Sequence, residues 1–326
     1  MDILLQVSLS ISIWFQNLGD WLFPLMKGVT FLGNEEFYLL VMPALYWCVD
    51  KILGIQIGVL LLLSGGTNFL LKLLFHSPRP FWVSSKVKNI VSAENFGFPS
   101  GHAQNAASLW GYIALRTKRG WLKAGVILVI FLIGVSRIIL GVHFVHDVLV
   151  GWMVGIVLLI LFLLLERPVS TWYAKQPFRK QILTGFLSSL VLIILALLFF
   201  SLLMDYQIPS AWIQNTQGEL DPFNLEGIIT ISGVLFGLLA GLSIIDTYGG
   251  FQTKGTLVQR AARFIIGASG VLLIWGGLDF LFPEEGFSLA LTLRYFRYLL
   301  VGLWISLGAP WFFIRLNLAQ KEDPAP

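Results

Sequence analysis

Charge is the first thing this sequence lacks. Only 12% of its 326 residues are Asp, Glu, Lys or Arg, compared with about 25% in a soluble domain, while 56% are hydrophobic. This composition excludes an ordinary soluble protein and indicates an integral membrane protein. The formal net charge of +4 does not indicate a nucleic-acid partner, because the basic residues lie in short clusters at the ends of apolar runs and form no single stripe or tail.

Cysteine is nearly absent as well. The single cysteine, Cys48, excludes an intramolecular disulfide framework and leaves the redox compartment open. The sequence also lacks the apolar and polar alternation of strands, internal repeats and low-complexity linkers, so we expect an all-α protein. The N-terminus has no basic segment followed by a small-residue cleavage site, and we therefore expect no removable signal peptide.

Long apolar runs are what the sequence has instead. About 20 apolar residues cross a bilayer as one helix, and the recurrence of such runs predicts a polytopic transmembrane helical bundle. We place nine candidate spans near residues 35–49, 53–75, 101–116, 121–140, 145–166, 181–204, 227–246, 261–282 and 289–314.

The first 30 residues allow two interpretations. On a helical wheel one face is apolar, with Ile3, Leu4, Val7, Ile11, Trp14, Phe15, Leu18 and Leu22. The opposite face is polar, with Asp2, Gln6, Ser12, Gln16 and Asp20. This pattern predicts an amphipathic helix lying in the membrane interface. Leu5, Leu9 and Ile13 interrupt the polar face, so a short first span is the alternative.

The distribution of basic residues predicts an orientation. If the odd-numbered spans end on one side, that side receives most of the Lys and Arg clusters between the spans, among them Lys51, Arg116, Lys118, Arg119, Lys123, Arg167, Lys175, Arg179, Lys180, Lys254, Arg260, Arg315 and Lys321. By the positive-inside rule this side is cytoplasmic. The opposite side receives the acidic loop 205–226, Glu35 with Glu36, and Glu284 with Glu285. Residues 72–102 and 137–147 are therefore expected to face the periplasm, a lumen or the exterior.

Three segments on that outer side carry polar groups that a membrane interior penalises. They are LLKLLFHSPRPFW (70–82), FGFPSGHAQN (96–105) and VSRIILGVHFVHDVL (135–149), and they contain all four histidines. Lys72, Arg79 and Arg137 are costly at helix ends unless a partner neutralises them. Guanidinium groups bind phosphate oxygens in pairs and an ammonium adds a point charge, so a phosphate group suits these three cations.

Ser100 and Gly101 precede an apolar run, where a helix is expected to begin. The free backbone N–H groups of its first turn would point at the anion, and Gly101 has no side chain to obstruct the approach. A plain turn with a helix cap explains the same Pro-Ser-Gly string equally well.

The histidines suggest catalysis. His143 and Asp147 are four residues apart at the start of the fifth predicted span, so the carboxylate can accept one ring N–H and leave the other nitrogen free to attack. His102, from another helix, could donate a proton to the leaving oxygen. We assign His76 and His146 to interfacial or packing roles. A metal site is the other use of His and Asp, but three cations would repel a divalent ion, so we expect no metal and no cofactor.

At these residues the sequence resembles the type 2 phosphatidic acid phosphatase superfamily. The signature of that family reads K-x6-R-P, then P-S-G-H, then S-R-x5-H-x3-D. All three parts are present here, at Lys72 to Pro80, Pro99 to His102, and Ser136 to Asp147.

The resemblance implies a metal-independent phosphatase with a helical membrane core. His143 would become phosphorylated and Asp147 would orient it, while His102 would protonate the departing alcohol and later activate water. The phosphoryl oxygens would be held by Lys72, Arg79, Ser100, Gly101 and Arg137.

The resemblance also predicts how the chain is organised. Residues 1–30 are the interfacial helix or short span, 31–166 the phosphatase core of five or six helices, and 167–326 a transmembrane extension of about four helices. The extra spans resemble the longer layout of the sphingosine-1-phosphate phosphatase branch, and LGNEEFY at 32–38 is similar to a segment of that branch.

These features predict a phosphatase acting on a phosphorylated lipid in the membrane. A lipid transporter or scramblase, or a phosphotransferase, that retains the same site is the alternative. The substrate is left open among phosphatidic acid, phosphatidylglycerophosphate, a sphingoid phosphate and a polyprenyl pyrophosphate. Gly237 and Gly241 form a G-x3-G pair, which is typical of close helix packing or of a homodimer face.

Overall fold

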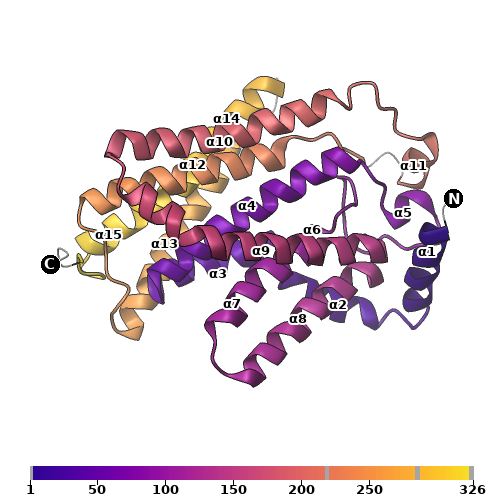
Figure 1. Cartoon of the computed structure of the whole chain (residues 1–326), viewed down its shortest axis with the longest axis horizontal. Helices are drawn as coiled ribbons and strands as arrows, with labels where there is room; N and C mark the ends of the chain where they lie inside the picture. The colour runs from indigo at the N-terminus through magenta and orange to yellow at the C-terminus, as the bar shows by residue number, and fades with distance from the viewer. Residues whose placement is uncertain (1–2, 217–219, 283–286, 323–326) are drawn as a thin grey trace. The chain divides into compact units, whose positions relative to one another are not determined.

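The computed structural model describes residues 3–216, 220–282 and 287–322 (Figure 1). Throughout these residues the regular secondary structure is helical, which confirms the predicted all-α class. The helices are α1 Ile3–Gln16, α2 Leu22–Phe31, α3 Glu35–Cys48, α4 Lys51–Phe75, α5 Pro80–Val83, α6 Gly101–Asn105, η1 Ala106–Trp110, α7 Gly111–Arg116, α8 Gly120–Ile139, α9 Val145–Ala174, α10 Phe178–Ser201, α11 Ser210–Asn215, α12 Glu226–Thr247, α13 Leu257–Leu281, α14 Phe287–Leu303, η2 Trp304–Gly308 and α15 Ala309–Arg315.

Seven helical stretches among the described residues are long and apolar enough to cross a membrane, which confirms a multi-pass membrane protein. They correspond to seven of the predicted spans. The other two predictions, 35–49 and 101–116, also fall on helices, namely α3 and the run from α6 to α7. At about 1.5 Å per residue both are shorter than the roughly 30 Å of a hydrocarbon core.

The N-terminal segment forms two helices where one was predicted. The chain breaks between α1 and α2, where Gly19 adopts a φ of +122° that other residues avoid. The predicted apolar face of α1 is the exposed one, as Ile3 and Trp14 show, whereas Ser12 and Gln16 are buried. The helix therefore turns its polar side toward protein. Whether this segment spans the membrane or lies on it stays a prediction.

The chain divides into two compact units, each assembled from three stretches. Unit 1 contains Met1–Tyr38, Leu63–Leu163 and Ala196–Asn224, and unit 2 contains Leu39–Leu62, Leu164–Leu195 and Leu225–Pro326. Helices α3, α4, α9 and α10 each supply residues to both units. The predicted boundaries at residues 30 and 166 stay predictions.

Among the residues used to predict orientation, Glu219, Glu284 and Glu285 lie outside the described part of the chain.

In unit 1, α8 packs against α1, α2, α6, η1 and α7. Helix α9 approaches the backbone of α6 closely because it carries glycine at the contact. A Cβ added to Gly151 would lie 2.6 Å from the carbonyl oxygen of Ser100, and one added to Gly155 would overlap that of Gln104. These glycines let the helix that carries Asp147 lie directly against the segment that carries Ser100.

In unit 2 the predicted G-x3-G pair lies at a helix contact inside the chain. Helix α12 packs along α14 and η2. A Cβ added to Gly237 would overlap the carbonyl oxygen of Leu299, and one added to Gly241 would overlap the hydroxyl of Ser306. Both glycines therefore serve close helix packing within one chain, and a homodimer face stays a prediction.

Candidate active site

All eight predicted site residues lie in unit 1, on elements that are far apart in the sequence. They come from the end of α4, the loop before α5, the start of α6, the end of α8, and the turn leading into α9. The predicted residues are Lys72, Arg79, Ser100, Gly101, His102, Arg137, His143 and Asp147.

His143 and Asp147 pair at the beginning of α9. The distance from His143 Nδ1 to Asp147 Oδ2 is 3.3 Å, and both side chains are buried. The helix begins at Val145, so His143 lies in the turn before it and not on its surface as predicted. The same carboxylate oxygen accepts the backbone N–H of Phe144 at 2.8 Å. Asp147 therefore caps its own helix and is fixed while it faces the imidazole.

Arg79 reaches the other side of the His143 ring. Its Nη1 lies 3.4 Å from His143 Nε2 and donates to the carbonyl of Val142 at 2.9 Å. Arg79 is 3% exposed. Its backbone is extended because Pro80 follows and begins α5, and a residue before proline avoids the helical region. The Arg-Pro pair thus turns the chain at the end of α4 and directs the guanidinium inward.

Lys72 and Arg79 converge on Asn95, a residue that the sequence analysis did not identify. Asn95 Oδ1 accepts from Lys72 Nζ at 2.9 Å and from Arg79 Nη2 at 2.5 Å. The carbonyl oxygen of Asn95 accepts from Arg79 Nε at 2.6 Å. These contacts join residues 16 and 23 positions apart, and no local pattern predicts them.

Ser100 and Gly101 begin α6, as predicted. Ser100 is the N-cap, and its side chain accepts from the backbone N–H of Ala103. Its own N–H donates to the carbonyl of Asp147 at 3.0 Å, which ties this segment to α9. A Cβ on Gly101 would lie 2.8 Å from Asn68 Oδ1. The absence of a side chain at Gly101 therefore also makes room for Asn68.

A buried polar network behind this segment was missed as well. Asn68 donates to the carbonyl of Pro99 at 3.2 Å and to Gln104 Oε1 at 3.0 Å. Gln104 donates to the carbonyl of Ser64 at 2.7 Å and to its hydroxyl at 3.0 Å. Ser64, Asn68 and Lys72 are spaced by four along α4, which was the available signal. The network satisfies buried polar groups and holds the loop that ends at Pro99.

Arg137 and His102 bond to the end of α2 and to the turn that follows it. Arg137 Nη1 donates to Thr30 Oγ1 in α2 at 2.8 Å, and His102 Nε2 donates to Asn34 Oδ1 in the turn at 2.8 Å. Thr30 and Asn34 are four residues apart and were also missed. Of the predicted side chains, these two make their hydrogen bonds with α2 and this turn and not with the His143 ring.

The charges of the predicted cations nevertheless act on one imidazole. Burial, followed by the positive charges of Arg79, Arg137 and Lys72, holds the pKa of His143 well below its usual 6.5. The ring is therefore neutral at neutral pH. With Nδ1–H donated to Asp147, its lone pair is on Nε2, on the side where Arg79 lies.

The two histidines assigned to packing have different surroundings. His76 packs edge-on against Tyr206, with ring centroids 4.8 Å apart. His146 stacks on Phe144 with centroids 5.3 Å apart, and its Nε2 lies 3.3 Å from Asp147 Oδ1. His146 thus also contacts the carboxylate of Asp147. The adjacent positions of the two residues in the sequence did not predict this contact.

An aromatic cluster from the loop after α10 covers α5. Asn215 Nδ2 donates to the carbonyl of Trp82 at 2.8 Å, and the Trp82 and Trp212 rings lie 5.6 Å apart. Phe223 contacts Phe96, with centroids 5.8 Å apart. The segment that holds Asn95 and Arg79 is thereby packed under apolar rings.

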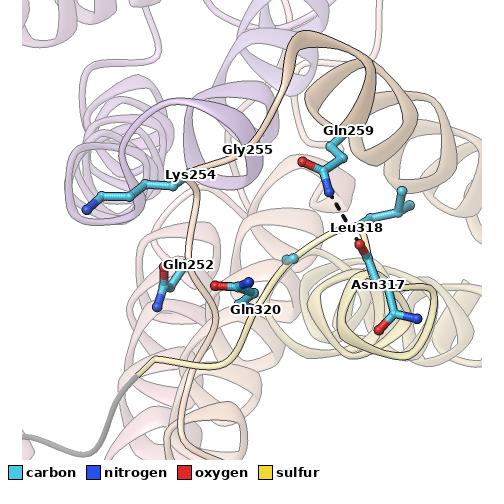
Figure 2. A pocket seen from close by; sticks show the side chains of 8 residues that line it. Gln252, Lys254, Gly255, Gln259, Asn317, Leu318 and Gln320 are labelled. Carbon is cyan, nitrogen blue, oxygen red and sulfur yellow. Dashed lines mark hydrogen bonds between the residues drawn. The ribbon is translucent and has the colours of Figure 1, made fainter.

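A cavity in unit 2 has a different character (Figure 2). Its volume is about 250 Å³, and it is lined by Gln252, Lys254, Gly255, Gln259, Asn317, Leu318, Ala319 and Gln320. Amides dominate this lining, and none of the predicted site residues belongs to it. Across the described ranges, no group of three or more His, Cys, Asp or Glu side chains is arranged to hold a metal ion.

Two family profiles match the chain. Residues 53–170 match the one described as "PAP2 superfamily", and residues 229–321 match "PAP2 superfamily phosphatase, transmembrane extension". The first covers all three signature segments, and the second covers much of unit 2.

Three relatives illustrate the similarity. Phosphatidylglycerophosphatase B of Bacillus subtilis (strain 168) is 35% identical over 156 residues, which are 43% of this chain and 73% of that protein. Glucose-6-phosphatase 3 of Bos taurus is 26% identical over 346 residues, covering 95% of this chain and 94% of that protein. Sphingosine-1-phosphate phosphatase 1 of Rattus norvegicus is 27% identical over 162 residues, covering 48% and 38%.

Proposed function

Because the chain belongs to the PAP2 superfamily, the type 2 phosphatidic acid phosphatases, and is a membrane phosphatase acting on phosphoric monoesters, we propose a specific reaction for it. The enzyme hydrolyses the phosphate ester of a lipid without a metal ion. The reaction proceeds through phosphorylated His143, on the non-cytoplasmic side of the membrane.

The observation that carries this proposal is the environment of His143. Its Nδ1 faces the Asp147 carboxylate at 3.3 Å, and its Nε2 faces the guanidinium of Arg79 at 3.4 Å. The carboxylate fixes the tautomer and leaves the lone pair on Nε2, where it can attack once the phosphoryl group takes the long contact from Arg79. A phosphoryl group held by Arg79 would lie next to that lone pair.

The reaction follows in two displacements. Nε2 of His143 attacks phosphorus, a P–N bond forms, and the bond from phosphorus to the lipid oxygen breaks. The proton that the leaving oxygen needs comes from His102, whose Nε2 lies 2.8 Å from Asn34 Oδ1. Water then attacks phosphorus, its proton passes to His102, and the P–N bond breaks to release inorganic phosphate and neutral His143.

The ligands of the phosphoryl oxygens supply the charge stabilisation. Lys72, Arg79 and Arg137 neutralise the charge that spreads over the equatorial oxygens in the transition state. The hydroxyl of Ser100 and the backbone N–H of Gly101 add donors on a further side, whereas the backbone N–H of Ser100 is bonded to the carbonyl of Asp147. Three fixed cations take the electrostatic role that a metal ion plays in other phosphatases, which is the basis for proposing a metal-independent reaction.

The names of two relatives support a lipid substrate. One is a phosphatidylglycerophosphatase and another a sphingosine-1-phosphate phosphatase. We therefore propose a lipid phosphate from the group of phosphatidic acid, phosphatidylglycerophosphate, sphingoid phosphates and polyprenyl pyrophosphates. A sugar phosphate is a second candidate, because the glucose-6-phosphatase of Bos taurus aligns along 94% of its length, including the C-terminal extension.

One assay separates these candidates. The purified protein in detergent is given each lipid phosphate and glucose 6-phosphate, with and without EDTA, and released phosphate is measured. We expect release from at least one lipid, unaffected by EDTA. Release from glucose 6-phosphate alone would favour the second candidate, and loss of activity in EDTA would contradict the metal-independent reaction. Lipid flipping in vesicles without phosphate release would indicate a transporter or scramblase. Transfer of the phosphoryl group to an added alcohol would indicate a phosphotransferase.

The side of the membrane is testable separately. The Lys and Arg distribution supports a position of Lys72, Arg79 and His143 outside the cytoplasm. In sealed right-side-out vesicles, a membrane-impermeant short-chain substrate is expected to be hydrolysed without detergent. Hydrolysis only after the vesicles are opened would reverse the assignment.

A further inference from the structure

Asn95 is in an unusual place for an uncharged side chain. Its Oδ1 accepts hydrogen bonds from two cations, Lys72 at 2.9 Å and Arg79 at 2.5 Å. Hydrogen bonds from ionised donors are short and strong, and their usual acceptors are anionic oxygens. A neutral amide oxygen therefore lies where the two cations would hold an oxygen of a phosphoryl group.

All five N–H donors of Arg79 are used within the protein. A guanidinium has five N–H groups. Three go to backbone carbonyls, those of Asn95 at 2.6 Å, Phe96 at 3.2 Å and Val142 at 2.9 Å. The other two go to side chains, Asn95 Oδ1 and His143 Nε2. An incoming anion can take a donor from a side chain, whereas taking one from a backbone carbonyl would require the loop to move.

Of these two side chains, only Asn95 is free to withdraw. Asn95 is exposed, whereas His143 is buried at 2% exposure. The backbone around Asn95 is held in place, because Arg79 bonds its carbonyl oxygen and the N–H of Gly97 donates to the carbonyl of Ser77 at 2.8 Å. Rotation about the side-chain bonds of Asn95 therefore opens Lys72 and Arg79 without displacing the loop.

We propose that the carboxamide of Asn95 is a placeholder ligand of the phosphate site, which a phosphomonoester dianion displaces from Lys72 and Arg79. This inference rests on the proposed function for the identity of the anion. The placeholder gives the two cations a hydrogen-bond acceptor within the protein, which lowers the cost of holding them near a membrane. It also sets a threshold, because an anion must outcompete the amide for both donors. A dianion does so more readily than a monoanion such as a phosphodiester.

Binding of inorganic phosphate tests the placeholder without turnover. The full-length protein in detergent is titrated with phosphate by calorimetry. Asn95→Ala removes the competitor, so phosphate is expected to bind about tenfold more tightly. Asn95→Asp puts a permanent carboxylate between the cations, so phosphate is expected to bind about 100-fold more weakly.

The same loop offers matched controls. Ser92 and Glu94 are exposed neighbours of Asn95. Ser92→Asp adds the same charge as Asn95→Asp, and Glu94→Ala makes a similar truncation. Both are expected to change phosphate affinity less than about threefold, since both side chains are exposed and exposed charges are screened.

Several results would overturn the inference. Weaker phosphate binding by Asn95→Ala would make Asn95 a direct ligand of the anion, and unchanged binding would make the contact incidental. If Ser92→Asp and Asn95→Asp lost phosphate affinity equally, the added negative charge alone would explain the loss and no contact of Asn95 with the cations would be needed. Thermal unfolding of each variant shows whether it is folded. If Asn95→Ala does not fold, Asn95→Gln provides a second test. Its longer side chain cannot place the amide in the same position, so phosphate should again bind more tightly than to the wild type.

The outcome is independent of the proposed reaction. If the wild-type protein hydrolyses no lipid yet its variants bind phosphate in the expected order, the function fails and the placeholder stands. If the wild-type protein hydrolyses a lipid and the variants bind phosphate alike, the placeholder fails and the function stands. Where turnover is measurable, Asn95→Ala is expected to lower KM with little change in kcat, a split that a purely structural role would not produce.

Discussion

Two buried arginines, one in each unit, differ in what they bind. In the described part of the chain, Arg263 of α13 donates its hydrogen bonds to the backbone carbonyls of residues 252–254, at 3.1, 2.9 and 3.2 Å. Arg79 also binds three carbonyls, but its remaining donors end on Asn95 and His143. A backbone carbonyl stays in place as long as the loop is folded. A side-chain acceptor can move away, and a ligand can then take its place on the arginine. Burial alone therefore does not identify a ligand-binding arginine, whereas the kind of group that accepts its hydrogen bonds does.

The same contrast extends to the helix contacts of each unit. Around Arg79 and His143, unit 1 buries polar side chains that bond to one another. Along α12 and α14, unit 2 brings backbones together at glycines. We therefore expect substitutions in the first region to reduce catalysis with little loss of stability, and substitutions in the second region to do the reverse.

Removing the proposed nucleophile should have the largest effect. His143→Ala is expected to lower kcat by about 10⁴-fold or more, because it removes the ring nitrogen that forms the P–N bond in the proposed reaction. Phosphate release under saturating lipid and thermal unfolding in detergent are the measurements. The matched control is His76→Ala, which lies outside the site and should retain activity within about tenfold. A His143→Ala rate near that of the wild type would remove the basis of the proposed reaction.

Exchanging each buried arginine for lysine tests the comparison directly. Arg79→Lys is expected to lower kcat/KM by about 10²–10³-fold, because one ammonium cannot reproduce the paired donors that face the phosphoryl group. Arg263→Lys is expected to leave kcat nearly unchanged and to lower stability by about 1–3 kcal/mol through lost bonds to carbonyls. The contrast would be wrong if both variants lost stability equally and retained the same activity.

Glycine substitution in the extension should act on stability alone. Gly237→Ala places a Cβ against the carbonyl of Leu299 and is expected to cost about 1–3 kcal/mol in thermal unfolding. Gly276 has no atom within 4 Å of an added Cβ, so Gly276→Ala is the matched control and should be neutral or slightly stabilising. Equal melting temperatures for the two variants would show that α12 and α14 do not pack as described.

The smallest effect concerns pH. In the proposed reaction neutral His143 is the reactive form, and its pKa is held below 6.5 by burial and by the charges of Arg79, Arg137 and Lys72. Activity should therefore persist as pH falls through 6.5 and decline only as pH falls through the lowered pKa.

Lys72→Gln removes one of these charges, so the acid limb of kcat/KM should move to higher pH, with relative rates differing by less than about tenfold. The ionisation of the substrate is common to both enzymes and cancels in the comparison. An acid limb that stayed in place or moved to lower pH would contradict the proposed influence of Lys72 on His143.

Much of this architecture could be predicted from the sequence. Apolar runs predicted the seven long helices, since length and hydropathy decide what crosses a bilayer. The three signature segments predicted the family, whereas a phosphate shared by Lys72 and Arg79 stays a prediction. The pairing of His143 with Asp147 was expected from their spacing, although the helix begins after His143 and the contact arises from a helix cap.

The residues that were missed depend on contacts between distant segments. Asn95 meets Lys72 and Arg79 only after the loop folds back, and Thr30 and Asn34 receive Arg137 and His102 from other helices. A polar residue in a loop has no periodicity to reveal such a partner. Asn68 was missed too, but the sequence did carry a signal for it, because its spacing of four from Lys72 places both residues on one face of α4.

The most direct test of the account is to trap the phosphorylated enzyme. The wild-type protein is mixed with a lipid phosphate carrying a labelled phosphoryl group, quenched rapidly in alkali, which preserves phosphohistidine, and digested for mapping. We predict label on the peptide that contains His143, appearing before the release of free phosphate, and no label in His143→Ala. Label on a different residue, or full turnover with no labelled protein at any time, would contradict it.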